Sequence, residues 1–431
     1  MRKVLWGTLC IFLMGSPVSL MASTSAQKQA AIDAGLAHLA DTQNSDGSWT
    51  DINGSGYNAA DTAAALLAFT EQNYKPLGWD GKNYSTVVTK ATNYLLSQAS
   101  VLPFDAGGNW SGFGAGQNGI QWYGGGEQTY VSGLAIPALS RLVTNPYGGA
   151  PLYSPSTVVG SINSDPTIQP LTYAQVIQKA VDSFTYYQTG PNYGNRYGGW
   201  RYYNNENDSD MSTTQWPVIS YLFASQVPGV TVPGNGSPTK TALQAWLKAD
   251  QYSDGGVDYL PGYGIVNATH AGGFLLSNFF AVGGGDAAKT LAWLNANWKG
   301  GPSGTWYGNE DGISSNPYAM WAVYKALETL YGTTGAGPIS NLNPLTTSLD
   351  DGATWNWWED YCQYLVTSQN SDGSFDGYGP WDGALADAWD INILNATQTQ
   401  QQPQVPEPST MLLFGSGLIG LLGYARKRRR Q

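Results

Sequence analysis

The sequence predicts an all-α protein built as a closed ring of six helix pairs, an α6/α6 toroid. Seven residues, QNSDGSW at 43–49, return as QNSDGSF at 369–375, with six identical. Between them, apolar residues recur at helical spacing, and turns rich in Gly and Asn separate the runs. One helix pair cannot bury its apolar face alone, so neighbouring pairs must stack. Because the first and last turns match best, we expect a ring with adjacent termini; an open solenoid is the alternative.

Each predicted pair has an outer helix, a turn and an inner helix. In the Asp-Gly turns, Asp bonds the local backbone, Gly takes positive φ, and the following aromatic residue packs beside the turn. The outer helices are expected at 30–39, 86–98, 173–187, 240–249, 287–297 and 355–368. The inner helices are expected at 58–69, 127–142, 212–224, 267–282, 315–330 and 383–394. The Pro-, Gly- and Ser-rich segment 145–170 is expected to be a surface loop.

Both ends of the chain lie outside this predicted domain, which covers residues 27–397. Residues 1–26 begin with a short basic stretch and an apolar run, which indicates a helical secretory signal peptide; a membrane anchor is the alternative. Residues 398–431 form a linker and tail, in which Pro406-Glu407-Pro408 precedes an apolar segment at 411–424, expected to be helical, and a basic cluster. That segment is short for a full span, which needs ~20 residues. The basic cluster favours the cytoplasmic side.

The order of Pro-Glu-Pro, apolar segment and Arg cluster resembles a PEP-CTERM sorting signal. The resemblance implies a Gram-negative bacterium, export by the secretion machinery, and an exosortase that cleaves near Pro406. It also implies a precursor anchored in the inner membrane by its tail, and a mature protein on the cell surface or in the extracellular matrix. Exopolysaccharide is the partner that such a location suggests.

The composition excludes several classes of function. The chain has 20 basic and 31 acidic residues, and this acidic balance disfavours nucleic acid and anionic lipid as partners. Cys10 belongs to the signal peptide, so Cys362 is left alone, and we expect it to be a small buried apolar residue. With one such Cys and two His, no structural zinc site is expected, and no cofactor is predicted.

The turns also resemble the QW motifs of the prenyltransferase and squalene-cyclase repeat superfamily. The resemblance is clearest at 43–49 and 369–375, and extends to Gly198-Gly199-Trp200 with residues 210–216. It implies the toroid fold, with Gln43 and Gln369 capping helix ends. The cyclase motif Asp-x-Asp-Asp has its nearest match in Asp208-Ser209-Asp210-Met211, where Met211 replaces the last acid. Cyclases also use two barrels, so cyclisation is not expected here.

The candidate catalytic residues are acids near the predicted starts of inner helices, together with one histidine. Two acids facing one mouth of the ring could act as acid and base on a polysaccharide. We favour the alternative that they are helix caps and first-turn carboxylates, worth ~0.3–1 kcal/mol each. A lone helical His is more often hydrogen-bonded in the core than catalytic. The candidates are Asp61, Glu127, Asp208, Asp210, Asp311, Asp387 and His270.

Aromatic residues among Gly and Asn suit the faces of sugar rings. Trp49, Trp200 and Trp306 are assigned to the core of the repeat, which leaves Trp110, Trp122, Tyr202 and Tyr203 as candidates for ligand binding. We therefore expect an exported protein that binds an extracellular glycan without catalysis. A polysaccharide lyase or hydrolase using cavity carboxylates, and a terpenoid-binding or terpenoid-processing enzyme, are the alternatives. Carboxylates paired with Arg or Lys in the cavity wall would favour sugar chemistry, and an apolar wall would favour isoprenoids.

Overall fold

The computed structural model describes residues 23–50, 54, 56–72, 84–105, 113, 116–123, 127–145, 150–203, 206–298, 316–342, 349 and 352–397. These residues are mostly helical, with one two-stranded sheet, which confirms the predicted helical class. The predicted tail helix and most of the signal peptide lie outside them. None of the helices within the described ranges has the length and apolar character needed to cross a bilayer.

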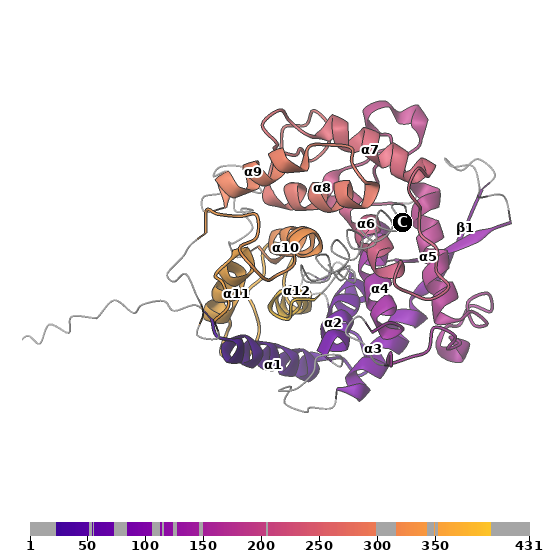
Figure 1. Cartoon of the computed structure of the whole chain (residues 1–431). Helices are drawn as coiled ribbons and strands as arrows, with labels where there is room; N and C mark the ends of the chain where they lie inside the picture. Colours follow the sequence, from indigo (N-terminus) through magenta and orange to yellow (C-terminus); the bar gives the residue numbers. More distant parts are fainter. Residues whose placement is uncertain are drawn as a thin grey trace, which may run out of the picture.

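The even-numbered helices form the inner layer. Their bounds are α2 (Asn58–Gln72), α4 (Gln128–Leu142), α6 (Met211–Ala224), α8 (Ala268–Ala281), α10 (Pro317–Tyr331) and α12 (Ala384–Leu394). Each inner helix packs against the next along the chain, and α12 packs against α2 (Figure 1). The contacts between inner helices therefore return to their starting point.

The odd-numbered helices lie outside this ring (Figure 1). Their bounds are α1 (Ser25–Thr42), α3 (Ser85–Ser97), α5 (Tyr173–Tyr187), α7 (Pro238–Asp250), α9 (Ala287–Asn297) and α11 (Trp357–Ser368). Helix α3 packs on α2, α5 on α4 and α6, α7 and α9 on α8, and α11 on α12. Helix α1 packs mainly on α12, so the first helix of the chain covers the last one.

Small residues allow the inner helices to approach closely. A Cβ atom on Gly272 in α8 would lie 2.6 Å from the backbone carbonyl carbon of Ala322 in α10. A Cβ atom on Gly133 in α4 would lie 2.5 Å from Cβ of Trp216 in α6. Such separations are far below normal carbon contacts, so glycine is required at both crossings.

Glutamines at the ends of outer helices tie one pair to the next. Four of them are the C-terminal caps of α1, α5, α7 and α11: Gln43, Gln188, Gln251 and Gln369. The Nε2 of each donates to a backbone carbonyl in or next to another outer helix, at Val87, Thr239, Asp286 and Ala31 respectively. We call the segments 43–49 and 369–375 the first corner and the last corner. The last corner docks on α1, which joins the two ends of the chain.

The tryptophans that follow the outer helices are structural. The indole Nε1 of Trp49 donates to the carbonyl of Leu39 at 2.8 Å, and that of Trp200 to Phe184 at 2.7 Å. Both residues are completely buried, as expected for the core of the repeat. An equivalent indole bond ties Trp122 to Leu95 at 2.7 Å.

A β-hairpin replaces part of the loop expected after α3. Strand β1 (Ala99–Pro103) pairs antiparallel with β2 (Asn118–Trp122), with Ala99 opposite Trp122. Strand β2 also packs against α5, where Ser183 Oγ donates to the carbonyl of Ile120 at 2.8 Å. The insertion at 145–170 contains the short 3-10 helix Gly160–Ile162 within its described part.

Candidate functional site

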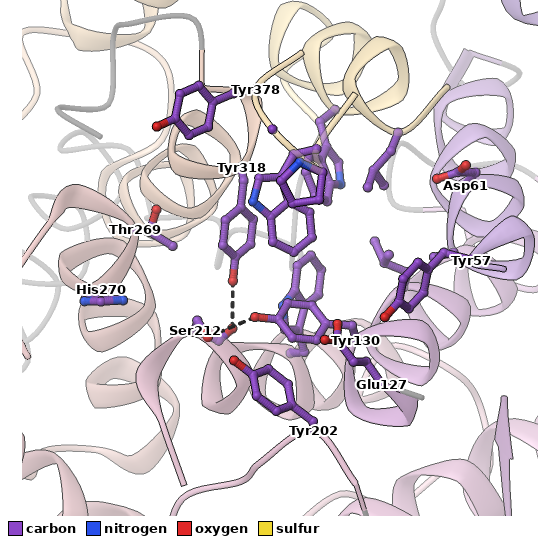
Figure 2. A pocket seen from close by; sticks show the side chains of 18 of the residues that line it. Tyr57, Asp61, Glu127, Tyr130, Tyr202, Ser212, Thr269, His270, Tyr318 and Tyr378 are labelled. Atoms are coloured by element: carbon purple, nitrogen blue, oxygen red, sulfur yellow. Dashed lines mark hydrogen bonds between the residues drawn. The ribbon is translucent and has the colours of Figure 1, made fainter. Parts of the chain in front are cut away.

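A cavity of about 660 Å³ opens at the centre of the ring, at the N-terminal ends of the inner helices (Figure 2). All six inner helices contribute to it, and the loop before α12 covers one side. Its volume is in the range of sites that hold small molecules. The described residues that line it are Tyr57, Ala60, Asp61, Glu127, Tyr130, Leu134, Tyr202, Ser212, Trp216, Tyr259, Asn267, Thr269, His270, Tyr318, Tyr378, Gly379, Pro380, Trp381, Leu385 and Trp389.

Stacked aromatic rings form one wall of the cavity. The ring centroids of Tyr318 and Trp381 lie 4.4 Å apart, and those of Trp216 and Tyr318 lie 6.1 Å apart with nearly parallel planes. Trp389 extends the group, 6.0 Å from Trp216. Each ring braces its neighbours, so this wall is rigid and presents a large apolar surface.

Hydrogen bonds from two tyrosine hydroxyls connect the helices at the inner end of the cavity. Tyr130 Oη donates to Ser212 Oγ at 2.9 Å, and Tyr318 Oη donates to the backbone carbonyl of Ser212 at 2.8 Å (Figure 2). Gln215 Nε2 in turn donates to Tyr318 Oη at 2.9 Å. Burial raises the pKa of both Tyr130 and Tyr318, so both phenols are neutral at physiological pH.

Two carboxylates face the cavity from one side. Figure 2 shows Tyr57, Asp61 and Glu127 together, across the cavity from Thr269 and His270. Glu127 is the N-cap residue of α4 and makes no capping hydrogen bond with its side chain. Burial raises its pKa, and the Tyr57 hydroxyl opposes this by bonding the carboxylate. Asp61 lies in the first turn of α2, as predicted, and its side chain is buried.

Asp210 lies behind the wall rather than on it. It caps α6, where its Oδ1 accepts from the Thr213 amide at 2.7 Å and from Ser212 Oγ at 2.5 Å. Its Oδ2 accepts from Arg201 Nη1 at 2.5 Å. Burial raises the pKa of Asp210, and the guanidinium and the hydroxyl oppose that rise. This arrangement is the capping role expected of the acids, extended by a buried ion pair.

The Arg201 guanidinium contacts two tyrosines in addition to Asp210. Its Nη1 also donates to Tyr259 Oη at 2.8 Å, and its guanidinium carbon lies 4.4 Å from the centroid of the Tyr202 ring. The hydroxyls of Tyr202 and Tyr259 are 2.6 Å apart. The wall near Arg201 is therefore made of two tyrosines, with the cation held behind them.

The other predicted site residues are scattered. His270 lines the cavity, but it is buried, its Nδ1 lies 3.1 Å from the Ile265 carbonyl, and burial lowers its pKa to about 4. Asp208 lies near the surface and pairs with Arg196 at 3.0 Å. Tyr203 is exposed outside the cavity, whereas its neighbour Tyr202 lines it. Asp311 and Trp110 lie outside the described residues.

Trp122 corrects the expectation that it is an available aromatic face. It is completely buried at the end of β2, and its backbone amide donates to Ser132 Oγ at 3.1 Å in α4. With its indole bond to α3, it occupies the structural position that Trp49 and Trp200 hold in their pairs. Trp122 therefore has no surface for a ligand in this structure.

The motif comparison identifies the end of the chain. Residues 404–430 match the PEP-CTERM protein-sorting motif. This motif marks an exported, exosortase-processed surface or extracellular protein. Pro406, Glu407 and Pro408 lie within the match and outside the described residues.

Comparisons of the whole chain add little. No curated protein matches it. A crystal structure of a protein from Actinoplanes is 13% identical and has a TM-score of 0.36; the match covers 86% of this chain and 99% of that one. This likeness is too weak to indicate a fold or a function. The described residues contain no group of three or more His, Cys, Asp or Glu that could hold a metal ion.

Most of the aromatic residues that line the cavity were not predicted from the sequence. They are Tyr57, Tyr130, Trp216, Tyr259, Tyr318, Tyr378, Trp381 and Trp389. A usable signal was present, because four of them fall within the first two turns of an inner helix: Tyr130, Trp216, Tyr318 and Trp389. In a ring, such positions converge on the centre.

Proposed function

We propose that the exported protein binds an extracellular glycan in the central cavity, and that its ring of helix pairs is an α6/α6 toroid used as a rigid receptor. A sugar presents apolar C–H faces and a rim of hydroxyls. A suitable site therefore combines flat aromatic surfaces with polar groups that fix orientation. The observation that carries the proposal is the combination, in one cavity, of the aromatic wall and the carboxylates of Asp61 and Glu127.

Polar side chains in the wall argue against a pure hydrocarbon ligand. Asp61, Glu127, Asn267 and Thr269 line the cavity beside the aromatic rings. The Asn267 side chain is already oriented, because its Oδ1 caps α8 by accepting from the His270 amide at 2.9 Å. A hydrocarbon ligand would displace water from these polar groups without replacing its hydrogen bonds, which costs free energy.

The environment of the acids favours binding without chemistry. Asp210 is held by Arg201, Ser212 and the Thr213 amide, and it is not one of the residues lining the cavity. His270 is neutral at physiological pH because burial lowers its pKa to about 4. Asp210 therefore cannot reach a ligand in the cavity, and a neutral His270 cannot act there as an imidazolium general acid.

Glycan hydrolysis is the second candidate, because Glu127 and Asp61 both line the cavity. Burial raises the pKa of Glu127, which is the environment of a general acid in glycoside hydrolysis. In this alternative Glu127 protonates the leaving oxygen and Asp61 acts as base or nucleophile. The two candidates differ in whether new reducing ends appear.

A glycan array combined with a reducing-end assay tests both candidates on the purified full-length protein. Binding without new reducing ends is the expected result. Release of new reducing ends would show that the protein is a hydrolase and not only a receptor. Binding of isoprenoid alcohols with no glycan bound would overturn the proposal in favour of a terpenoid site.

Two neighbouring tyrosines locate the binding site. Tyr202→Ala removes a cavity wall and is expected to weaken glycan binding about tenfold, which corresponds to about 1.4 kcal/mol. Tyr203→Ala changes an exposed ring outside the cavity and should leave affinity unchanged. Tyr331→Ala, at the far end of α10, serves as a further control. An equal loss in Tyr203→Ala and Tyr202→Ala would place the site on the surface instead.

A further inference from the structure

The charged side chains among the described residues that line the cavity are both acidic. Among the described lining residues, Asp61 and Glu127 are the carboxylates, and no lysine or arginine is present. The imidazole of His270 also lines the cavity, and its lowered pKa of about 4 leaves it neutral near pH 7. The local field therefore favours a cation and disfavours an anion.

The nearest guanidinium does not offset this charge. Arg201 Nη1 is bonded to Asp210 at 2.5 Å and to Tyr259 Oη at 2.8 Å, and its Nε lies 3.9 Å from Asp208. Arg196 also pairs with Asp208, at 3.0 Å, so two arginines face two carboxylates. Their charges balance, and the group behind the tyrosines adds no net positive charge to the cavity.

A buried amine lies on the other side of the wall. Lys325 Nζ is 4.6 Å from the ring centroid of Trp216 and 5.1 Å from that of Trp321, and it has no partner among the described residues. Burial lowers its pKa well below the ordinary value, which favours the uncharged amine. The Trp216 ring is therefore not already occupied by a full positive charge.

The aromatic rings add to the preference for a cation. The negative face of an aromatic ring attracts ammonium and guanidinium groups. The structure already shows this at the edge of the cavity, where Arg201 lies over Tyr202 and, at 5.4 Å, over Tyr259. The inner faces of the cavity rings offer the same attraction to a ligand.

We infer that the sugar unit bound in the cavity carries a protonated amine, as in a hexosamine without its acetyl group. The Glu127 carboxylate, which bonds the Tyr57 hydroxyl, accepts from the ammonium, and Asp61 adds negative charge on the same side of the cavity. Tyr202 and the aromatic wall cover the sugar ring. An N-acetylated unit has no charge for these acids, and a uronic acid is repelled by them. This inference rests on the proposed glycan function and narrows its ligand class.

The experiment compares three oligosaccharides of equal length on the full-length protein by calorimetry: glucosamine, N-acetylglucosamine and galacturonic acid oligomers. The pH is set so that the glucosamine amines are protonated. We expect the glucosamine oligomer to bind at least tenfold more tightly than the acetylated one, and the uronic acid oligomer not to bind. Equal or tighter binding of the acetylated or acidic oligomer would overturn the inference while leaving the glycan function intact.

A matched pair of variants removes one negative charge in two places. Glu127→Gln is expected to bring the affinity for the glucosamine oligomer down to that for the acetylated one, with thermal unfolding unchanged. Asp41→Asn removes the same charge from an exposed position near the end of α1, and should keep the full preference. Equal losses in both variants would show that the effect comes from the overall charge of the protein. The assignment of Glu127 to the binding site would then be wrong. If no oligosaccharide of any kind binds, the glycan function itself fails.

Discussion

The first corner and the last corner are built from nearly the same residues, yet they dock on different partners. Gln43 Nε2 donates at 3.0 Å both to Gly47 within its turn and to Val87 in α3, the next outer helix. Gln369 Nε2 donates at 2.9 Å to Gly373 and at 2.8 Å to Ala31 in α1, the first helix of the chain. The same glutamine-containing turn thus joins one helix pair to the next in the first corner and closes the ring in the last corner.

The two corners differ beneath the turn. The amide of Trp49 donates to the Thr62 hydroxyl at 3.2 Å, whereas the amide of Phe375 donates to the Asp387 carboxylate at 2.7 Å. Burial raises the pKa of Asp387 to about 7, and His38 Nε2 in α1 lies 3.7 Å from its Oδ2. The closing corner therefore has a titratable group where the first corner has a neutral one.

The largest effect is expected from a buried charge pair at the point where the ring closes. Lys28 Nζ in α1 bonds both oxygens of Glu359 in α11, at 2.8 and 3.0 Å, and both side chains are buried. Lys28→Met leaves Glu359 without this cation and should lower the free energy of unfolding by about 3 kcal/mol, measured with urea. Asp208→Asn breaks a partly exposed pair and should cost less than about 1 kcal/mol. Equal losses would show that closure does not depend on the buried pair.

Glycine replacements test whether both corners dock equally tightly. Gly47 and Gly373 have φ of 95° and 92°, and a Cβ would lie 2.4 Å from the carbonyl oxygens of Lys90 and Ala34 respectively. Alanine at either position should cost about 2 kcal/mol or more, because it adds a clash to the strain of positive φ. Gly229 has φ of 85°, and no atom lies within 4 Å of an added Cβ. Gly229→Ala should therefore cost only the strain of positive φ, about 1 kcal/mol. A small cost at Gly373 alone would indicate a loosely closed ring.

Removing each corner glutamine side chain compares the same bonds at the two places. Gln43→Ala and Gln369→Ala each lose two hydrogen bonds to backbone carbonyls, so each should cost about 1–2 kcal/mol. Thermal unfolding by circular dichroism measures both. A much smaller cost for Gln369→Ala would mean that the closing contact contributes little to stability.

The last prediction concerns the pH dependence of stability. The folded-state pKa of Asp387 is raised to about 7, above its ordinary value of 3.8, so the native protein binds this proton more tightly than the unfolded chain. Its contribution to stability is therefore present at low pH and is lost as pH rises from about 4 to 7. Asp387→Thr, which copies the first corner, removes this carboxyl group and should flatten a slope of up to about 1.4 kcal/mol per pH unit. An unchanged slope relative to the parent protein would contradict the assignment.

The helices could be predicted from sequence because their signals are local. The inner helix expected at 212–224 is observed at Met211–Ala224, and the outer helix expected at 173–187 has those bounds. Cys362 is buried, as expected for a small apolar residue. Each of these features depends on apolar spacing and on capping residues within one short segment.

The position of Trp122 and the cavity wall depend on contacts that no short segment contains. Trp49 follows its carbonyl partner by 10 residues, whereas Trp122 follows Leu95 by 27, because the β-hairpin lies between them. Tyr130 and Trp381 are remote in sequence, yet their ring centroids lie 5.6 Å apart. Likewise, the sequence pattern around Asp210 does not indicate that Arg201 pairs with its carboxylate.

The docking of the last corner on α1 has a consequence for how the chain matures. The bond from Gln369 to Ala31 spans 338 residues, so α1 reaches its final environment only after the last helix pair has been delivered. Contacts of such long range are slow to form. During export, the segment that is translocated first is therefore the one that waits longest, with its apolar face exposed until the last helix pair arrives.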